Sequence, residues 1–154
     1  KWSVQISSDG KYGLYAPTRG GLEIFEFRNG KVVRTLIGKV AEGVYDVLTF
    51  FTPTNNHVIY YNKGKRTIRV FRASDGQQIA DMKCQAKVRQ AMATPDGKAL
   101  VVAYEDGAVQ MFLIVDQLDQ ESITHLQLWR QQQLQTDVED FVPQEIVEKE
   151  LIEE

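Results

Sequence analysis

Apolar and polar residues alternate along the first 115 residues in short segments that turn residues separate at regular intervals. In the segment 67–71, for example, Ile68 and Val70 lie on either side of Arg69. This period of two is typical of strands that bury one face of a sheet. Asp-Gly or Asn-Gly pairs supply the positive φ angles of tight hairpins, and such pairs begin at Asp9, Asn29, Asp75, Asp96 and Asp106. The pattern therefore predicts repeated hairpins of short antiparallel strands.

The hairpins recur with a period of about 43 residues, since Asp9 and Asp96 lie two repeats apart. A period of this length, with the same strand-turn-strand order in each copy, predicts the blades of a β-propeller. We therefore expect an all-β fold of about three four-stranded antiparallel blades, over 1–42, 43–86 and 87–130. Rings of four to eight blades are usual, so three blades form an incomplete ring. A β-sandwich is the alternative fold.

The expected strands follow the same order in each copy. They cover 4–7, 12–16, 22–27 and 32–37 in the first copy, 47–51, 57–61, 67–71 and 77–82 in the second, and 88–93, 99–104 and 108–114 in the third. In the third copy the fourth element is left open, because the segment around His125 suits either a last strand or a helix.

Three of these segments carry a family resemblance. The segments 22–25, 68–71 and 109–112 resemble the third strand of WD repeats, with Phe25, Phe71 and Phe112 where the usual Trp stands. The sequence departs from that family because it has no Gly-His pair. Its residues at the Asp position of the Trp-Asp signature are Glu26, Arg72 and Leu113. The Asp-His tetrad of WD repeats is therefore not carried over, and quinoprotein-like propellers stay open as an alternative.

Degenerate repeats followed by a polar tail are similar to the C-terminal propellers of NACHT and WD-repeat ATPases, of the STAND type. This resemblance implies a place at the end of a larger signalling protein. It also implies that any nucleotide hydrolysis occurs outside this chain. The sequence begins at Lys1 rather than Met, which suggests a piece of a longer protein.

Charge divides the chain into two parts. Residues 1–115 carry 16 Lys and Arg against 10 Asp and Glu, whereas residues 116–154 carry 2 against 11. We therefore expect a basic body and an acidic, partly helical tail over 131–154. Pro143 in a first turn, followed by an apolar stripe, predicts a helix over 144–152. We expect Leu126 to Leu134 to dock on the blades.

Composition narrows the setting of the protein. Cys84 is the single cysteine, and no Asn-x-Ser/Thr sequence occurs, which together favour a cytoplasmic location. No apolar run approaches the length of a membrane span, so we expect no membrane contact. Arg19-Gly20-Gly21 occurs once, between two strands, and indicates a hairpin loop rather than an RNA-binding element.

A search for catalytic chemistry assigns no residue. Gly64-Lys65-Arg66-Thr67 differs from a phosphate-binding loop because Ile59 stands where the leading Gly is required. His57 and His125 are far apart and have no further ligand at zinc spacing. The innermost strand expected of each blade contains no His or carboxylate. We therefore expect no catalytic residue, metal site or cofactor, and no enzyme in this chain.

Basic residues gather in the loops expected at one end of the blades. They are Arg19, Lys39, Lys63, Lys65, Arg66, Lys83 and Lys87, and the carboxylates in the same loops are Glu42, Glu105 and Asp106. At the other end, Asp9, Asp75 and Asp96 partly balance the cations Lys11, Arg28, Lys31, Arg72 and Lys98. The leading hypothesis is a protein-interaction scaffold whose basic end docks an acidic segment of a partner protein. The remaining propeller blades, from this chain or another, would be further partners. The alternative is a ligand-binding or hydrolytic propeller with its site in blades outside this chain.

Overall fold

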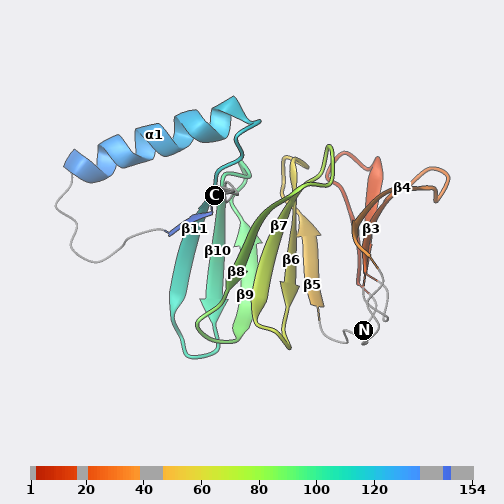
Figure 1. Ribbon diagram of the computed structural model, residues 1–154, viewed down its shortest axis with the longest axis horizontal. Coiled ribbons are helices and arrows are strands. Elements are labelled where there is room, and N and C mark those ends of the chain that lie inside the picture. Colours follow the sequence, from red (N-terminus) through yellow and green to blue (C-terminus); the bar gives the residue numbers. More distant parts are fainter. Residues whose placement is uncertain (1–2, 17–20, 39–46, 136–143, 147–154) are drawn as a thin grey trace, which may run out of the picture.

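The computed structural model describes residues 3–16, 21–38, 47–135 and 144–146, and in them the strands form three four-stranded sheets that stand side by side (Figure 1). The first blade contains β1 Ser3–Ile6, β2 Tyr12–Ala16, β3 Leu22–Glu26 and β4 Val32–Ile37. The second contains β5 Val47–Phe51, β6 His57–Asn62, β7 Thr67–Arg72 and β8 Gln78–Lys83. The third contains β9 Val88–Ala93, β10 Ala99–Tyr104, β11 Val109–Ile114 and β12 Gln144–Ile146. The predicted all-β, blade-like fold class is confirmed.

The tight turns form where the sequence predicted them. All five glycines of the Asp-Gly and Asn-Gly pairs have φ between 70° and 90°, the left-handed region that a side chain disfavours. Before the first turn of each blade a hydroxyl group accepts a hydrogen bond from the strand that follows. The pairs are Ser7 with the Tyr12 N–H (2.9 Å), Thr52 with the His57 N–H (3.1 Å) and Thr94 with the Ala99 N–H (3.0 Å). The same hydrogen bond to a hydroxyl group in all three blades shows that the three copies form this turn in the same way.

The second and third blades enclose the larger apolar core. Tyr61 and Ile68 from the second blade pack there with Leu100 and Phe112 from the third, and all four side chains are buried. The neighbouring Tyr60 points the other way, into the core between the first and second blades. Because the second blade has a neighbour on each side, every residue of β6 is buried.

The first and second blades share a smaller core and several hydrogen bonds near the surface. Leu14 and Ile24 pack against Tyr60 and Phe71. The turn of the second blade has Asn55 rather than Gly in the left-handed conformation, with φ of 61°. Its amide group accepts a hydrogen bond from the Ser8 N–H at 2.9 Å and donates one to the Ser8 hydroxyl at 2.8 Å. A departure from the turn pattern thus links two blades.

Helix α1, Gln120–Gln135, follows the third blade and starts inside the range 87–130 that the sequence assigned to it. Asp119 caps the helix, since its carboxylate accepts hydrogen bonds from the Glu121 N–H (3.1 Å) and the Ser122 hydroxyl (2.6 Å). Leu126 is buried against Leu113 on the outer face of the third blade, which confirms that this residue docks. In the described part of the chain, no helix is both long and apolar enough to cross a membrane.

Strand β12 corrects the prediction for the tail. The segment 144–146 is a strand paired with β11, not the start of a helix, and residues 147–152 lie outside the described ranges. It pairs in parallel, whereas an antiparallel fourth strand was expected. The crossover through α1 explains the direction, because parallel neighbours require a long connection of this kind. The unpaired edge of β11 supplies the hydrogen bonds that favour a strand over a short isolated helix.

Candidate functional site

Five of the seven predicted basic residues lie on neighbouring loops at one end of the blades, and all five are exposed. Lys63, Lys65 and Arg66 form the turn between β6 and β7. Lys83 ends β8, and Lys87 precedes β9. We call this group of five residues the basic end. Arg19 and Lys39 lie outside the described residues.

Backbone hydrogen bonds join the loops of the basic end. The Cys84 N–H donates to the Arg66 carbonyl at 2.8 Å, which holds the β8–β9 connection against the β6–β7 turn. The Glu105 N–H donates to the Lys87 carbonyl at 2.8 Å, which adds the β10–β11 turn. The carboxylates of Glu105 and Asp106 therefore lie beside the cations. The five cations exceed these two carboxylates, so this end carries a positive field.

Three cations at the opposite end have carboxylate partners within reach, as the sequence suggested. Lys11 Nζ lies 3.9 Å from Asp9, and Lys98 Nζ lies 3.8 Å from Glu121. Arg72 donates to Asp75 at 2.6 Å. Three cations at this end are thus neutralised over short distances, whereas Arg28 and Lys31 are exposed in the turn between β3 and β4.

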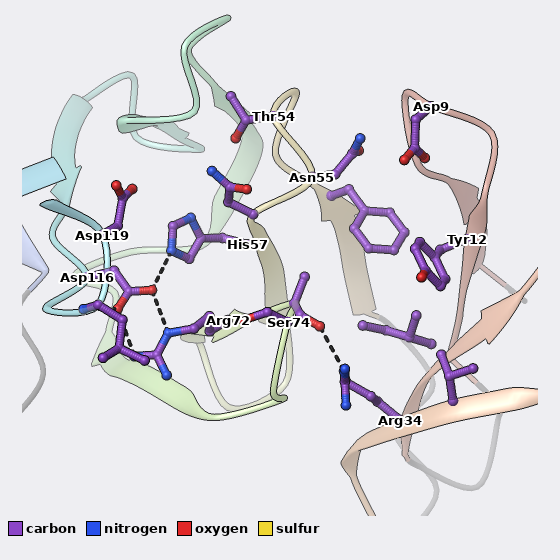
Figure 2. A pocket seen from close by; sticks show the side chains of 16 residues that line it. Asp9, Tyr12, Arg34, Thr54, Asn55, His57, Arg72, Ser74, Asp116 and Asp119 are labelled. Carbon is purple, nitrogen blue, oxygen red and sulfur yellow. Dashed lines mark hydrogen bonds and ion pairs between the residues drawn. The ribbon is translucent and has the colours of Figure 1, made fainter. Parts of the chain in front are cut away.

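A buried polar cluster joins the second blade to the segment that leaves the third. Arg72 forms two hydrogen bonds to the Asp116 carboxylate, at 2.8 Å from Nε and 2.7 Å from Nη2. His57 Nε2 lies 3.0 Å from the same carboxylate. Figure 2 shows the three side chains meeting at the wall of a pocket. The Asp116 and His57 side chains are each 2% exposed, so the cluster is shielded from water.

This cluster fixes the charge of its central carboxylate. Burial alone would raise the pKa of Asp116, but hydrogen bonds from Arg72 and His57 outweigh burial and lower the pKa to about 2. The Asp116 carboxylate in turn raises the pKa of the Arg72 guanidinium above its ordinary value. Arg72 and Asp116 are therefore a charged pair over the physiological range of pH.

Sequence reasoning missed this cluster. The sequence showed that Arg72 replaces the Asp of the Trp-Asp signature, but it placed Arg72 among the loop cations. Asp116 lies 44 residues from Arg72 and 59 from His57, so no local spacing signals their contact. Among the described residues, no three His, Cys, Asp or Glu side chains are arranged to hold a metal ion.

The single cysteine lies away from this cluster, in the core between the second and third blades. Burial raises the pKa of the Cys84 thiol, while a hydrogen bond with Tyr104 opposes that shift. A buried thiol with a raised pKa is a poor nucleophile, which fits a structural role for Cys84.

Phe25, Phe71 and Phe112 occupy the same position in successive blades. Phe71 is buried between the first and second blades, and Phe112 between the second and third. Phe25 pairs with Val32 on the outer face of the first blade, where Val32 is 46% exposed. Val4 and Ile6 on β1 are more than half exposed and share this face. The first blade thus presents an uncovered apolar face at the position that its neighbours bury.

Comparisons with known proteins agree with this arrangement. A family model described as the NWD2 C-terminal beta-propeller matches residues 1–114. No curated protein matches the sequence. Two similar solved structures are the hydrazine synthase of Kuenenia stuttgartiensis and the Cps50 (Swd1) beta-propeller domain of Myceliophteria thermophila.

The hydrazine synthase match has a TM-score of 0.57 and 18% identity, and it covers 74% of this chain and 35% of that one. The Cps50 match has a TM-score of 0.59 and 13% identity, and it covers 71% of this chain and 34% of that one. The chain therefore spans about a third of each of these proteins. At such low identity the likeness shows the propeller fold alone.

Proposed function

The chain belongs to the NWD2 C-terminal beta-propeller family, and from that membership we propose that it is a protein-interaction scaffold in a larger intracellular signalling protein. The basic end captures an acidic segment of a partner protein. The observation that carries this proposal is the grouping of five exposed cations on hydrogen-bonded loops. A positive field of this kind attracts acidic partners and speeds their association.

The loops are held in place, which favours recognition over a diffuse charge effect. The Lys65 N–H donates to the Asn62 side chain at 3.0 Å, and Arg66 adopts a φ of 53° at the turn. The Cys84 N–H, in the connection between β8 and β9, donates a hydrogen bond to the Arg66 carbonyl of the same turn. A rigid loop loses little conformational freedom when a partner binds, so less of the binding energy is spent on ordering it.

Further propeller blades are the second class of partner in this proposal. Phe71 and Phe112 each fill an interface with the preceding blade. On the outer face of the first blade, Phe25 stands at the position equivalent to Phe71 and Phe112. This face has no neighbouring blade among the described residues. A further blade, from this chain or another, fits that face because exposed apolar patches of this kind mark interaction surfaces.

We further propose that the chain acts in the cytoplasm and has no catalytic activity of its own. Any ATPase activity would belong to another part of the parent protein. The strands β1, β5 and β9 carry no His or carboxylate, so these innermost strands give no support to the alternative, a ligand-binding or hydrolytic propeller with its site in blades outside this chain.

Charge reversal at the basic end tests the proposal. An acidic peptide rich in Asp and Glu is titrated into the chain at low and at high salt. We expect the double variant Lys65→Glu with Arg66→Glu to bind the peptide roughly tenfold more weakly at low salt, because two attractive charges become repulsive. High salt is expected to reduce the difference.

The matched control reverses two exposed cations at the other end, Arg28→Glu with Lys31→Glu, both in the turn between β3 and β4. The net charge of the chain changes by the same amount in both double variants. Equal binding by the two variants at low salt would show that net charge, and not the basic end, attracts the peptide.

A further inference from the structure

A pocket of about 660 Å³ opens between the first and second blades, at the end opposite the basic end (Figure 2). Residues from the first turn of each of these blades line it, together with Ser74 and the segment 116–119. The volume lies in the range of sites that bind small molecules or peptide side chains. The pocket shares no residue with the basic end.

The wall of the pocket contains a hydrogen-bond acceptor without a partner. Asp116 is ionised and only accepts hydrogen bonds, so His57 Nε2 must carry the proton that the carboxylate accepts. In the neutral imidazole this leaves Nδ1 as an acceptor. Nδ1 is buried and has no hydrogen-bond partner among the described residues. A buried acceptor in that state costs about 1–3 kcal/mol, which a suitable donor recovers.

Part of the rim of the pocket is apolar. Tyr12 and Val33 from the first blade are each 40% exposed, and Leu118 on the opposite side is 73% exposed. Phe51 and Ile24 lie deeper. Apolar side chains at the rim and deeper in the pocket favour an apolar anchor, such as an aromatic side chain of a partner protein.

Charge in the pocket does not select a charged ligand. Arg34 Nε donates to the Ala73 carbonyl at 3.0 Å, and its positive charge balances that of Asp119, while Asp9 has Lys11 as a partner at 3.9 Å. Arg72 and Asp116 neutralise each other. The pocket therefore suits an uncharged group that combines an apolar body with one hydrogen-bond donor.

We propose that this pocket binds a tyrosine or tryptophan side chain from a short segment of a partner protein. The ring packs against Leu118, residues next to it contact Tyr12 and Val33 on the other side, and the phenol O–H or indole N–H donates to His57 Nδ1. Tyr and Trp are the side chains that combine a large apolar surface with a single donor. The volume exceeds that of one side chain, which leaves room for the residues on either side.

The hydrogen bond forms as the ligand enters. Nδ1 lies below the pocket surface, so the donor reaches it when the side chains that cover it move aside. The hydrogen bond then forms where water does not compete for it, so it contributes more to the binding free energy than a hydrogen bond at the rim.

Three pentapeptides test the proposal: Gly-Gly-Tyr-Gly-Gly, Gly-Gly-Trp-Gly-Gly and Gly-Gly-Phe-Gly-Gly. Each is titrated into the whole chain, and histidine ring nitrogens are followed by NMR. We expect the Tyr and Trp peptides to bind roughly tenfold more tightly than the Phe peptide, which has no donor. The Nδ1 signal of His57 is expected to shift on binding, while His125, the other histidine, serves as the internal control.

Substitution of the rim separates this site from unspecific binding to apolar surface. Leu118→Ser is expected to weaken binding of the Tyr peptide, whereas Leu128→Ser, at an exposed position on α1 outside this pocket, is expected to leave it unchanged. Equal binding of the Tyr and Phe peptides, no binding at all, or indifference to Leu118→Ser would each overturn the proposal. The variant with Lys65→Glu and Arg66→Glu should bind the Tyr peptide normally, so this test and that of the basic end can fail independently.

Discussion

The interface between the second and third blades differs from that between the first and second in how it is held together. The interface between the second and third blades has the larger apolar core and, at one end, the buried pair of Arg72 with Asp116. The other has a smaller core, hydrogen bonds near the surface such as that of Asn55 with Ser8, and a pocket where packing is incomplete.

This difference indicates which of the two interfaces is more stable and which opens more readily. Regions with fewer buried contacts and more exposed hydrogen bonds open at lower free energy. We therefore expect the second and third blades to behave as one unit and the first blade to separate from them more readily. Ligand sites are often found in the less stable part of a protein, which agrees with the position of the pocket.

The largest effect is expected from Asp116→Ala. The substitution leaves Arg72 charged and buried without its main partner, which costs about 3–5 kcal/mol of unfolding free energy. The measurement is urea denaturation followed by circular dichroism. The control is Asp81→Ala, because Asp81 pairs with the partly exposed Arg69 at 3.0 Å, and such a pair contributes less than about 1 kcal/mol. Similar losses for both variants would contradict the role given to the buried pair.

The same pair predicts the response to acid. Because the pKa of Asp116 is lowered from 3.8 to about 2 in the folded chain, its contribution to stability is complete above pH 3.8 and is lost as the pH falls through about 2. Denaturation curves recorded across this range should show a steeper loss for the original chain than for Asp116→Asn. Parallel pH profiles would show that Asp116 titrates as in the unfolded chain.

A pair of leucine substitutions compares the two cores. Leu14 and Leu100 are both fully buried on the second strand of their blades. Leu100→Ala is expected to cost about 2–5 kcal/mol and to speed amide exchange in both the second and third blades. Leu14→Ala should speed exchange mainly in β1 to β4. Exchange that rises equally in all three blades after Leu14→Ala would show that the first blade does not open separately.

The smallest effect is expected from two turn glycines. Gly10 and Gly97 both have φ of 70°, so alanine at either position costs about 1 kcal/mol. A Cβ at Gly97 would lie 2.5 Å from Thr54 Oγ1 in the second blade, whereas a Cβ at Gly10 would meet nothing within 4 Å. Gly97→Ala should therefore lower the melting temperature more than Gly10→Ala. The reverse order would mean that the turn of the third blade is not packed closely against the second.

The sequence predicted the strands well because their signals are local. The Asp-Gly and Asn-Gly pairs define where the chain reverses, and the alternation of Ile68 and Val70 with Arg69 defines which face is buried. Both signals act within a few residues. Strand β2, for example, has the predicted bounds, Tyr12–Ala16.

The sequence predicted less well where distant segments meet. Nothing near Gln144 indicates that its backbone pairs with β11, because that pairing depends on an edge formed 30 residues earlier. The contact of Arg72 with Asp116 has the same origin, and so does the pocket, whose walls come from two blades and the segment after β11. The basic end was predicted because its loops occupy equivalent places in a repeat. Whether it binds a partner stays a prediction.

The apolar outer faces have a consequence for assembly. One is the face around Phe25 on the first blade, and the other is the part of the outer face of the third blade beyond the contact with α1, where Met92 and Val109 are exposed. Two different apolar surfaces on the outermost blades of one molecule favour head-to-tail association. Such contacts extend into filaments unless the rotation between neighbouring molecules closes a ring. A preparation of this chain alone would therefore stay monomeric only at low concentration, or with polar residues in place of Val4 and Val109.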